Sequence, residues 1–109
     1  MPKTAIPPDN VQAAARRGLD LRAEQPPSNR GGTVIGLARA RQIANGQPVS
    51  LSTLRRMVSY FARHAVDKNG DGWGKDSKGY QAWLLWGGDA GRAWATRQVA
   101  RLTRKTYTS

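Results

Sequence analysis

The sequence contains no cysteine. Disulfide bonds and cysteine-ligated metal sites are therefore excluded, and the composition is compatible with the reducing interior of a cell. No apolar run approaches the ~18 residues that a membrane-spanning helix requires. Residues 1–8 contain one lysine and no apolar stretch, so we expect neither a secretory signal nor a membrane-inserted segment.

Acidic residues are absent from a long internal stretch. No Asp or Glu occurs between Glu24 and Asp67. Over the whole chain, 18 Lys and Arg oppose 7 Asp and Glu, which gives a formal net charge of +11 on 109 residues. Such a surface repels itself and favours a polyanionic partner, of which nucleic acid is the commonest. Most of the basic residues are arginine, which binds phosphate with two parallel hydrogen bonds. A GC-rich genome would produce the same excess of arginine.

Hydrophobic residues recur with helical spacing over much of the chain, and no alternating strand pattern stands out. This periodicity predicts an all-α fold, a compact bundle of about five helices in one domain of residues 1–109. The predicted helices span residues 10–24, 33–45, 51–66, 80–86 and 90–104. A long glycine-rich loop, residues 67–79, separates the third helix from the fourth. We expect residues 1–8 and 105–109 to be flexible.

Three polar residues immediately precede predicted helices and are typical N-caps: Asp9, Ser50 and Asp89. The third helix has the clearest core stripe. Its members are Leu51, Leu54, Val58, Phe61, Ala62 and Ala65.

The aromatic residues divide into two groups by their surroundings. Four of them lie in apolar segments and are predicted to be core: Phe61, Trp83, Trp86 and Trp94. Trp73 stands between glycines in the predicted loop. It either faces a partner or folds back as a lid over the core.

Arginine recurs at helical spacing on the sides of helices that face away from the core stripes. On the third helix Ser52, Arg56, Ser59 and Arg63 share one face, where two guanidinium groups alternate with hydroxyls. The predicted nucleic-acid-binding residues are Arg39, Arg41, Arg56, Arg63, Arg97, Arg101 and Arg104. The alternative is a solvated basic surface without a partner.

A helix-turn-helix is a second interpretation of residues 40–58. The connection at residues 46–50 is longer than the 3–4 residues typical of that motif. We therefore favour phosphate contacts that carry little sequence information.

Residues 67–72 match the first half of a calcium loop, D-x-N-x-D-G. The twelfth position, where a bidentate carboxylate belongs, is Lys78, so the sequence predicts no metal ion or other cofactor. His64 is the single histidine, and the sequence has no nucleophile motif, P-loop or paired carboxylates. We therefore expect no enzymatic activity. Arg and Trp also bind anionic lipid surfaces, but the core stripe of the third helix indicates a globular domain and no membrane partner.

Four stretches resemble a known domain: residues 14–19, 36–46, 55–68 and 82–94, the last containing W-G-G-D-A-G-R-A-W. The chain resembles a small helical domain of tailed-phage proteins, which occurs alone or fused to head-assembly proteins. That domain has no settled activity, so the resemblance implies a phage setting and a place in the host cytoplasm or the virion. It implies either a DNA-binding accessory protein or a virion component. Docking on a phage or host protein, including inhibition of a host enzyme that handles nucleic acid, remains the alternative.

Overall fold

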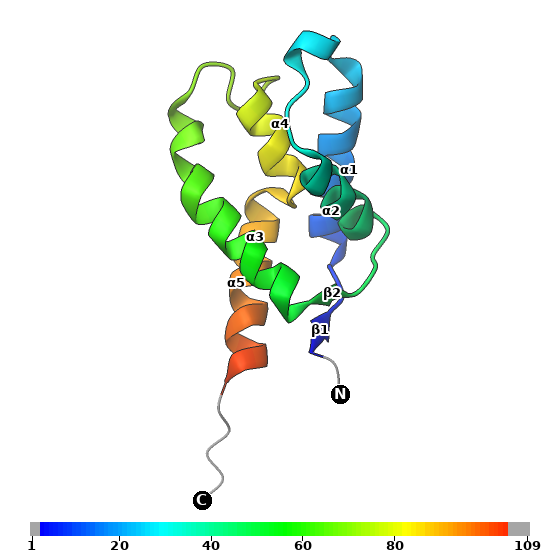
Figure 1. The fold of residues 1–109 in the computed structure, drawn as a ribbon, viewed down its shortest axis with the longest axis vertical. Coiled ribbons are helices and arrows are strands. Elements are labelled where there is room, and N and C mark those ends of the chain that lie inside the picture. Colours follow the sequence, from blue (N-terminus) through cyan, green and yellow to red (C-terminus); the bar gives the residue numbers. More distant parts are fainter. Residues whose placement is uncertain (1–2, 105–109) are drawn as a thin grey trace, which may run out of the picture.

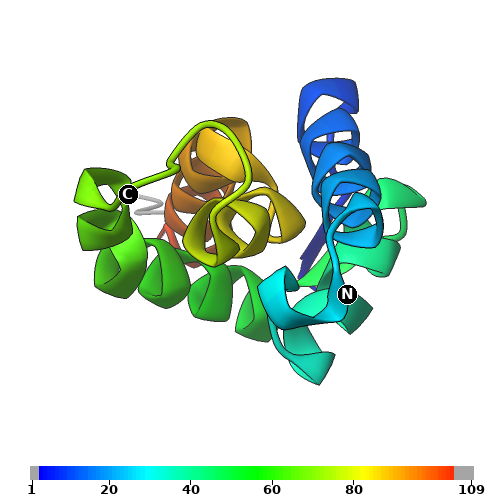
Figure 2. The same cartoon turned by 90° about the horizontal axis from the view of Figure 1, so that it is seen from above.

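The computed structural model describes residues 3–104, in which five α-helices form a compact bundle, so the predicted all-α fold is confirmed. Helices α2 and α3 form one layer, and α1, α4 and α5 form the other (Figures 1 and 2). In chain order the elements are β1 (Thr4–Ala5), α1 (Asp9–Glu24), the 3-10 turn η1 (Pro27–Asn29), α2 (Val34–Ala44), β2 (Val49–Ser50), α3 (Leu51–His64), the 3-10 turn η2 (Ala65–Asn69), α4 (Lys78–Leu85) and α5 (Gly88–Thr103).

Three helices begin at a hydroxyl side chain that accepts a hydrogen bond from a backbone N–H three residues ahead. The caps are Thr33 for α2, Ser50 for α3 and Ser77 for α4. Each satisfies one of the N–H groups that a helix start leaves unpaired. The predicted cap of α3 at Ser50 is confirmed.

The other two helices begin differently from the prediction. Pro8 and Gly87 are the N-caps of α1 and α5, and neither makes a side-chain cap. Asp9 and Asp89, which we expected to be caps, lie inside the first turns. Gly87 has a φ of 111°, which only glycine adopts readily, so the chain turns directly from α4 into α5.

Residues 3–8, part of the segment 1–8 that we expected to be flexible, include a short strand. Thr4–Ala5 pairs with Val49–Ser50 in an antiparallel register, Thr4 opposite Ser50, and both Ala5 and Pro7 are buried. Strands of two residues are too short to produce the alternating pattern by which strands are predicted from sequence. Residues 1–2 and 105–109, also expected to be flexible, lie outside the described residues.

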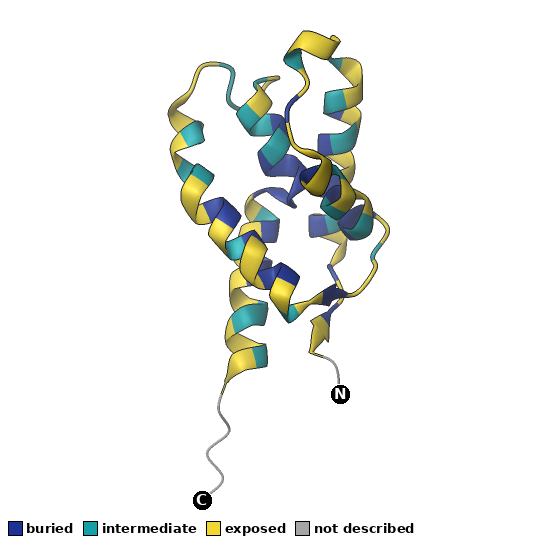
Figure 3. Ribbon diagram, in the orientation of Figure 1, coloured by how far each residue is buried: buried dark blue, intermediate teal, exposed yellow. Residues whose placement is uncertain are grey.

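The core collects side chains from all five helices, and the outward face of α3 is exposed (Figure 3). The four aromatic residues predicted to be core are buried there: Phe61, Trp83, Trp86 and Trp94. The stripe of α3 is rotated from the prediction, because Met57 and Tyr60 are buried while Ala62 is exposed. Burying a methionine and a tyrosine removes more apolar area from water than burying an alanine.

The segment between α3 and α4 is shorter than the predicted loop, because η2 prolongs α3 to Asn69 and α4 begins at Lys78. Turns fill residues 70–77, where Gly72 and Gly74 have positive φ. Trp73 is half-buried, and its ring meets the rings of Tyr80 and Trp83 edge-on at centroid distances of 5.2 and 5.4 Å. Trp73 therefore folds back over the core.

Helix α1 crosses α4 at Gly18. A Cβ placed on Gly18 would lie 2.7 Å from the backbone N of Leu85 and 2.9 Å from the carbonyl carbon of Leu84. Since both neighbours are backbone atoms, no side-chain rotation relieves the clash. Glycine at this position is what allows the two helices to approach.

We expect Gly18→Ala to lower the free energy of unfolding by about 1–3 kcal/mol, because the added methyl group overpacks the crossing. Gly36→Ala on α2 is the matched control. Its Cβ would lie 3.4 Å from Nε1 of Trp86, at the limit of ordinary contact, so helix propensity should raise stability by up to about 1 kcal/mol. Chemical denaturation measures both, and equal effects of the two substitutions would contradict the role of Gly18.

Candidate functional site

A groove opens on the layer formed by α2 and α3. Its walls are the start of α2 and the side of α3 that carries Tyr60 and His64, and α4 lies between these two helices (Figure 1). Its volume is about 920 Å³, and its lining surface is mainly apolar. We call it the α3 groove. It is lined by Gly32, Thr33, Ile35, Arg55, Arg56, Ser59, Tyr60, Arg63, His64, Asp67, Lys78, Gly79, Ala82 and Trp86.

The helical repeat of α3 brings its polar stripe into this groove. Arg56, Ser59 and Arg63 are separated by three and four residues, so they share one face of the helix. All three are exposed and line the groove. Arg55 precedes this stripe by one residue and lines the groove as well.

The groove carries an excess of positive charge. Arg55, Arg56, Arg63 and Lys78 line it, and Asp67 is the single acidic residue among its described lining. Oδ2 of Asp67 lies 3.1 Å from Nδ1 of His64. Within residues 3–104 no arginine forms an ion pair with a carboxylate. The cationic side chains of the groove are therefore not paired with carboxylates of the described residues.

Two helix N-termini also contribute partial positive charge to the groove. Thr33, the N-cap of α2, and Lys78 and Gly79 of the first turn of α4 all line the groove. Neither helix has an acidic residue in its first turn. The partial positive charge at the start of α2 therefore acts on the groove without an acidic residue in the same helix turn, whereas at the start of α4 the Asp67 carboxylate lies beside Gly79 and offsets part of that charge.

An aromatic stack forms the apolar wall of the groove. The ring of Tyr60 lies between those of His64 and Trp86, at centroid distances of 4.6 and 4.9 Å with interplanar angles of 27° and 16°. Burial raises the pKa of Tyr60, and the nearby Asp67 carboxylate raises it further, so the phenol stays neutral. Its hydroxyl has no hydrogen-bond partner within the described chain.

Gln81 fixes the relative positions of α4 and the segment that leads into α2. Its amide nitrogen donates to the carbonyl oxygens of Asn29 and Asp76, at 2.7 and 2.9 Å, and its Oε1 accepts from Gly31 N at 2.8 Å. Gln81 is fully buried, and a Cβ on Gly31 would collide with the backbone of Lys78. The two helix starts at the groove are therefore held together by a buried amide.

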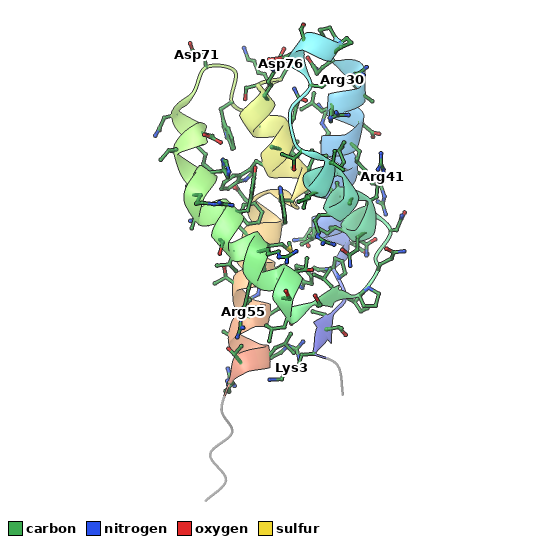
Figure 4. All side chains as sticks on the ribbon, viewed as in Figure 1. Lys3, Arg30, Arg41, Arg55, Asp71 and Asp76 are labelled. Atoms are coloured by element: carbon green, nitrogen blue, oxygen red, sulfur yellow. The ribbon has the colours of Figure 1, made fainter. Side chains whose placement is uncertain are left out.

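Of the predicted nucleic-acid-binding residues, Arg56 and Arg63 lie in the groove and the other five do not. Arg39 is half-buried and donates to Gln42, and Arg41 is exposed on the opposite side of the view from Arg55 (Figure 4). Arg97, Arg101 and Arg104 are exposed along the C-terminal half of α5 and at its end.

Arg55 and Lys78 line the groove but were not among the predicted nucleic-acid-binding residues. Arg55 falls outside the i, i+4, i+7 stripe, but it is an arginine next to Arg56 on the same helix. Lys78 was assigned to a loop, whereas the Ser77 cap makes it the first residue of α4. A serine that ends a glycine-rich run is a typical helix N-cap, and this signal at Ser77 could have predicted that α4 begins at Lys78.

Residues 3–104 contain no cluster of three or more His, Asp or Glu side chains that could hold a metal ion. None of the helices in this range is long and apolar enough to cross a membrane.

Comparisons of the chain with models of protein families, with curated proteins and with solved structures found no match.

Besides the contact between His64 and Asp67, the described residues contain an ion pair at the start of α5, between Lys68 and Asp89. Oδ1 of Asp89 accepts hydrogen bonds from Nζ of Lys68 at 2.8 Å and from the indole Nε1 of Trp83 at 2.9 Å. The hydrogen bond from Lys68 lowers the pKa of Asp89, and that from Trp83 acts in the same direction. Because the folded protein favours the ionised form, the contact stabilises the fold above the ordinary pKa of 3.8.

We expect Asp89→Asn to be less stable than the wild type at neutral pH and the difference to shrink as the pH falls through the lowered pKa of Asp89. Chemical denaturation at pH values from about 7 down to about 2 measures this linkage. Asp20→Asn, at an exposed position on α1, controls for the loss of one negative charge. A stability difference for Asp89→Asn that is constant over this range would refute the contribution of the carboxylate.

Proposed function

We propose that the protein binds nucleic acid through phosphate contacts, and that the α3 groove is the main contact surface. The observation that carries this proposal is the meeting of four cationic side chains, from α3 and α4, in one groove with a single acidic residue. An arginine side chain can donate two parallel hydrogen bonds to the oxygens of a phosphate group. Phosphate contacts supply most of the affinity of sequence-independent binding.

The polar side chains of the groove also favour phosphate contacts over base recognition. Apart from the charged residues, Thr33, Ser59 and Tyr60 carry the hydroxyls of the lining, and no Asn or Gln belongs to its described residues. Asn and Gln are the usual readers of adenine, and the described lining has neither; its arginines are proposed to contact phosphate rather than guanine. The protein is proposed to bind many sequences with similar affinity.

The exposed arginines of α5 extend the basic surface. Arg97 and Arg101 are separated by one helical turn and are exposed. They are proposed as secondary phosphate contacts, together with Arg104. The resemblance to a phage domain supports a role on phage nucleic acid, in the host cytoplasm or in the virion.

A second candidate function is docking on another phage or host protein. Val34 and Ile35, at the start of α2, are 85% and 59% exposed, and Ile35 lines the groove. An exposed apolar pair beside a groove is typical of protein contact sites. This candidate predicts a partner protein that co-purifies with the chain and remains bound after nuclease treatment.

The salt dependence of binding tests the proposed function. We expect log K for a random-sequence oligonucleotide to fall linearly with log salt, by about 0.9 per phosphate contact on duplex DNA and about 0.7 on a single strand. The double variant Arg56→Ala/Arg63→Ala should reduce the magnitude of this slope by the contribution of about two phosphate contacts. It should also weaken binding to all sequences alike. Fluorescence anisotropy at a series of salt concentrations measures both.

The matched control is Arg17→Ala/Lys75→Ala, which removes the same charge from exposed positions outside the groove. We expect its slope to stay close to that of the wild type. Equal flattening in both double variants would show that net charge, and not the groove, determines binding. The absence of binding at low salt would overturn the proposed function.

A further inference from the structure

The α3 groove is concave, whereas a DNA duplex presents its phosphates on a convex surface. Its volume of about 920 Å³ lies near the upper end of the ~300–1,000 Å³ typical of ligand pockets. Phosphate groups alone would leave most of its apolar lining uncovered. The occupant that suits the groove therefore has an apolar body as well as negative charge.

The arrangement of charged and apolar side chains in the groove suits an occupant that has both an apolar body and negative charge. Ile35, Ala82 and Trp86 supply apolar lining from α2 and from α4 and its C-cap. Arg56 and Arg63 line the groove from α3, two helical turns apart, which is about 10 Å at 1.5 Å per residue. Lys78 contributes a further cation from the start of α4.

We propose that the α3 groove binds an unpaired nucleotide of a single strand, with the base against the apolar lining and the flanking phosphates on Arg56 and Arg63. This inference rests on the proposed function and adds the form of nucleic acid that the groove accepts. Proteins that bind single strands combine a basic groove with aromatic and apolar surface for the bases. A base inside a duplex is stacked and paired and cannot reach such a lining.

The same groove predicts tolerance of base identity. Contact between a base and apolar or aromatic surface needs a flat ring, which every base has, and it does not depend on the donors and acceptors of that ring. The described lining offers no amide side chain that would distinguish one base from another. Oligonucleotides of one pyrimidine and of mixed sequence should therefore bind with affinities within a few-fold of each other.

A groove-filling variant separates this inference from the proposed function. Ser59 is exposed on α3 and lines the groove, so Ser59→Leu fills part of the groove without changing any charge. Ser52→Leu is the matched control, because Ser52 is exposed on the same helix face but does not belong to the lining. Leucine is a good helix former, so both variants should fold, which circular dichroism verifies.

Binding is measured by fluorescence anisotropy at one salt concentration. The probes are a labelled single-stranded DNA of about 12 nucleotides and the same sequence as a duplex. The wild type should bind the single strand at least tenfold more tightly than the duplex. Ser59→Leu should weaken single-strand binding about tenfold and leave duplex binding unchanged, whereas Ser52→Leu should change neither.

Two other outcomes would overturn the inference, and they differ in what they say about the proposed function. Equal binding of single strand and duplex, with no effect of Ser59→Leu, rejects the nucleotide site but leaves phosphate binding in place. No binding of either DNA, together with binding of a poly-glutamate peptide that Ser59→Leu weakens, rejects both and assigns the groove to an acidic protein partner.

Discussion

The geometry of the groove depends on the buried amide of Gln81. This one side chain joins the segment before α2, through Asn29 and Gly31, to the turn before α4, through Asp76. A buried amide with three hydrogen bonds is stable only in one arrangement, because each unmet bond leaves a polar group without water. It thereby sets the two helix starts side by side, facing α3.

The charge of the groove follows from what the sequence omits. Residues 25–66 contain no Asp or Glu, so α2 and α3 have no carboxylate with which to pair their arginines. Where arginines are held within the described chain, they donate to neutral oxygens, as Arg16 does to the Ala44 carbonyl and Arg22 does to the Gly31 carbonyl. Within the described residues the groove arginines therefore have no carboxylate partner, and this excess of positive charge is the basis of the proposed function.

Much of the fold could be predicted from sequence, because helical periodicity and hydroxyl caps act over a few residues. Four of the buried aromatic residues and the exposed Arg56–Arg63 stripe followed from local pattern alone. Sequence reasoning missed what depends on distant contacts, such as the pairing of Thr4–Ala5 with Val49–Ser50 and the burial of Tyr60 against Trp86.

The groove itself could be predicted only in part for the same reason. Its lining comes mainly from three helices spread over residues 32–86, and nothing in the neighbourhood of Lys78 indicates that it will line the same groove as Arg63. The arginines of α5 show that regular spacing alone does not place a side chain in the groove. Their spacing is as regular as that of α3, but they do not belong to the groove.

The central claim is that the groove, rather than the overall charge, is where nucleic acid binds. The most direct measurement is a ¹H–¹⁵N correlation spectrum of the full chain titrated with a short single-stranded oligonucleotide. The account predicts that the largest shifts occur at backbone amides around Thr33, Ser59, Arg63 and Lys78. Shifts confined to α5, or spread evenly over all basic residues, would contradict it.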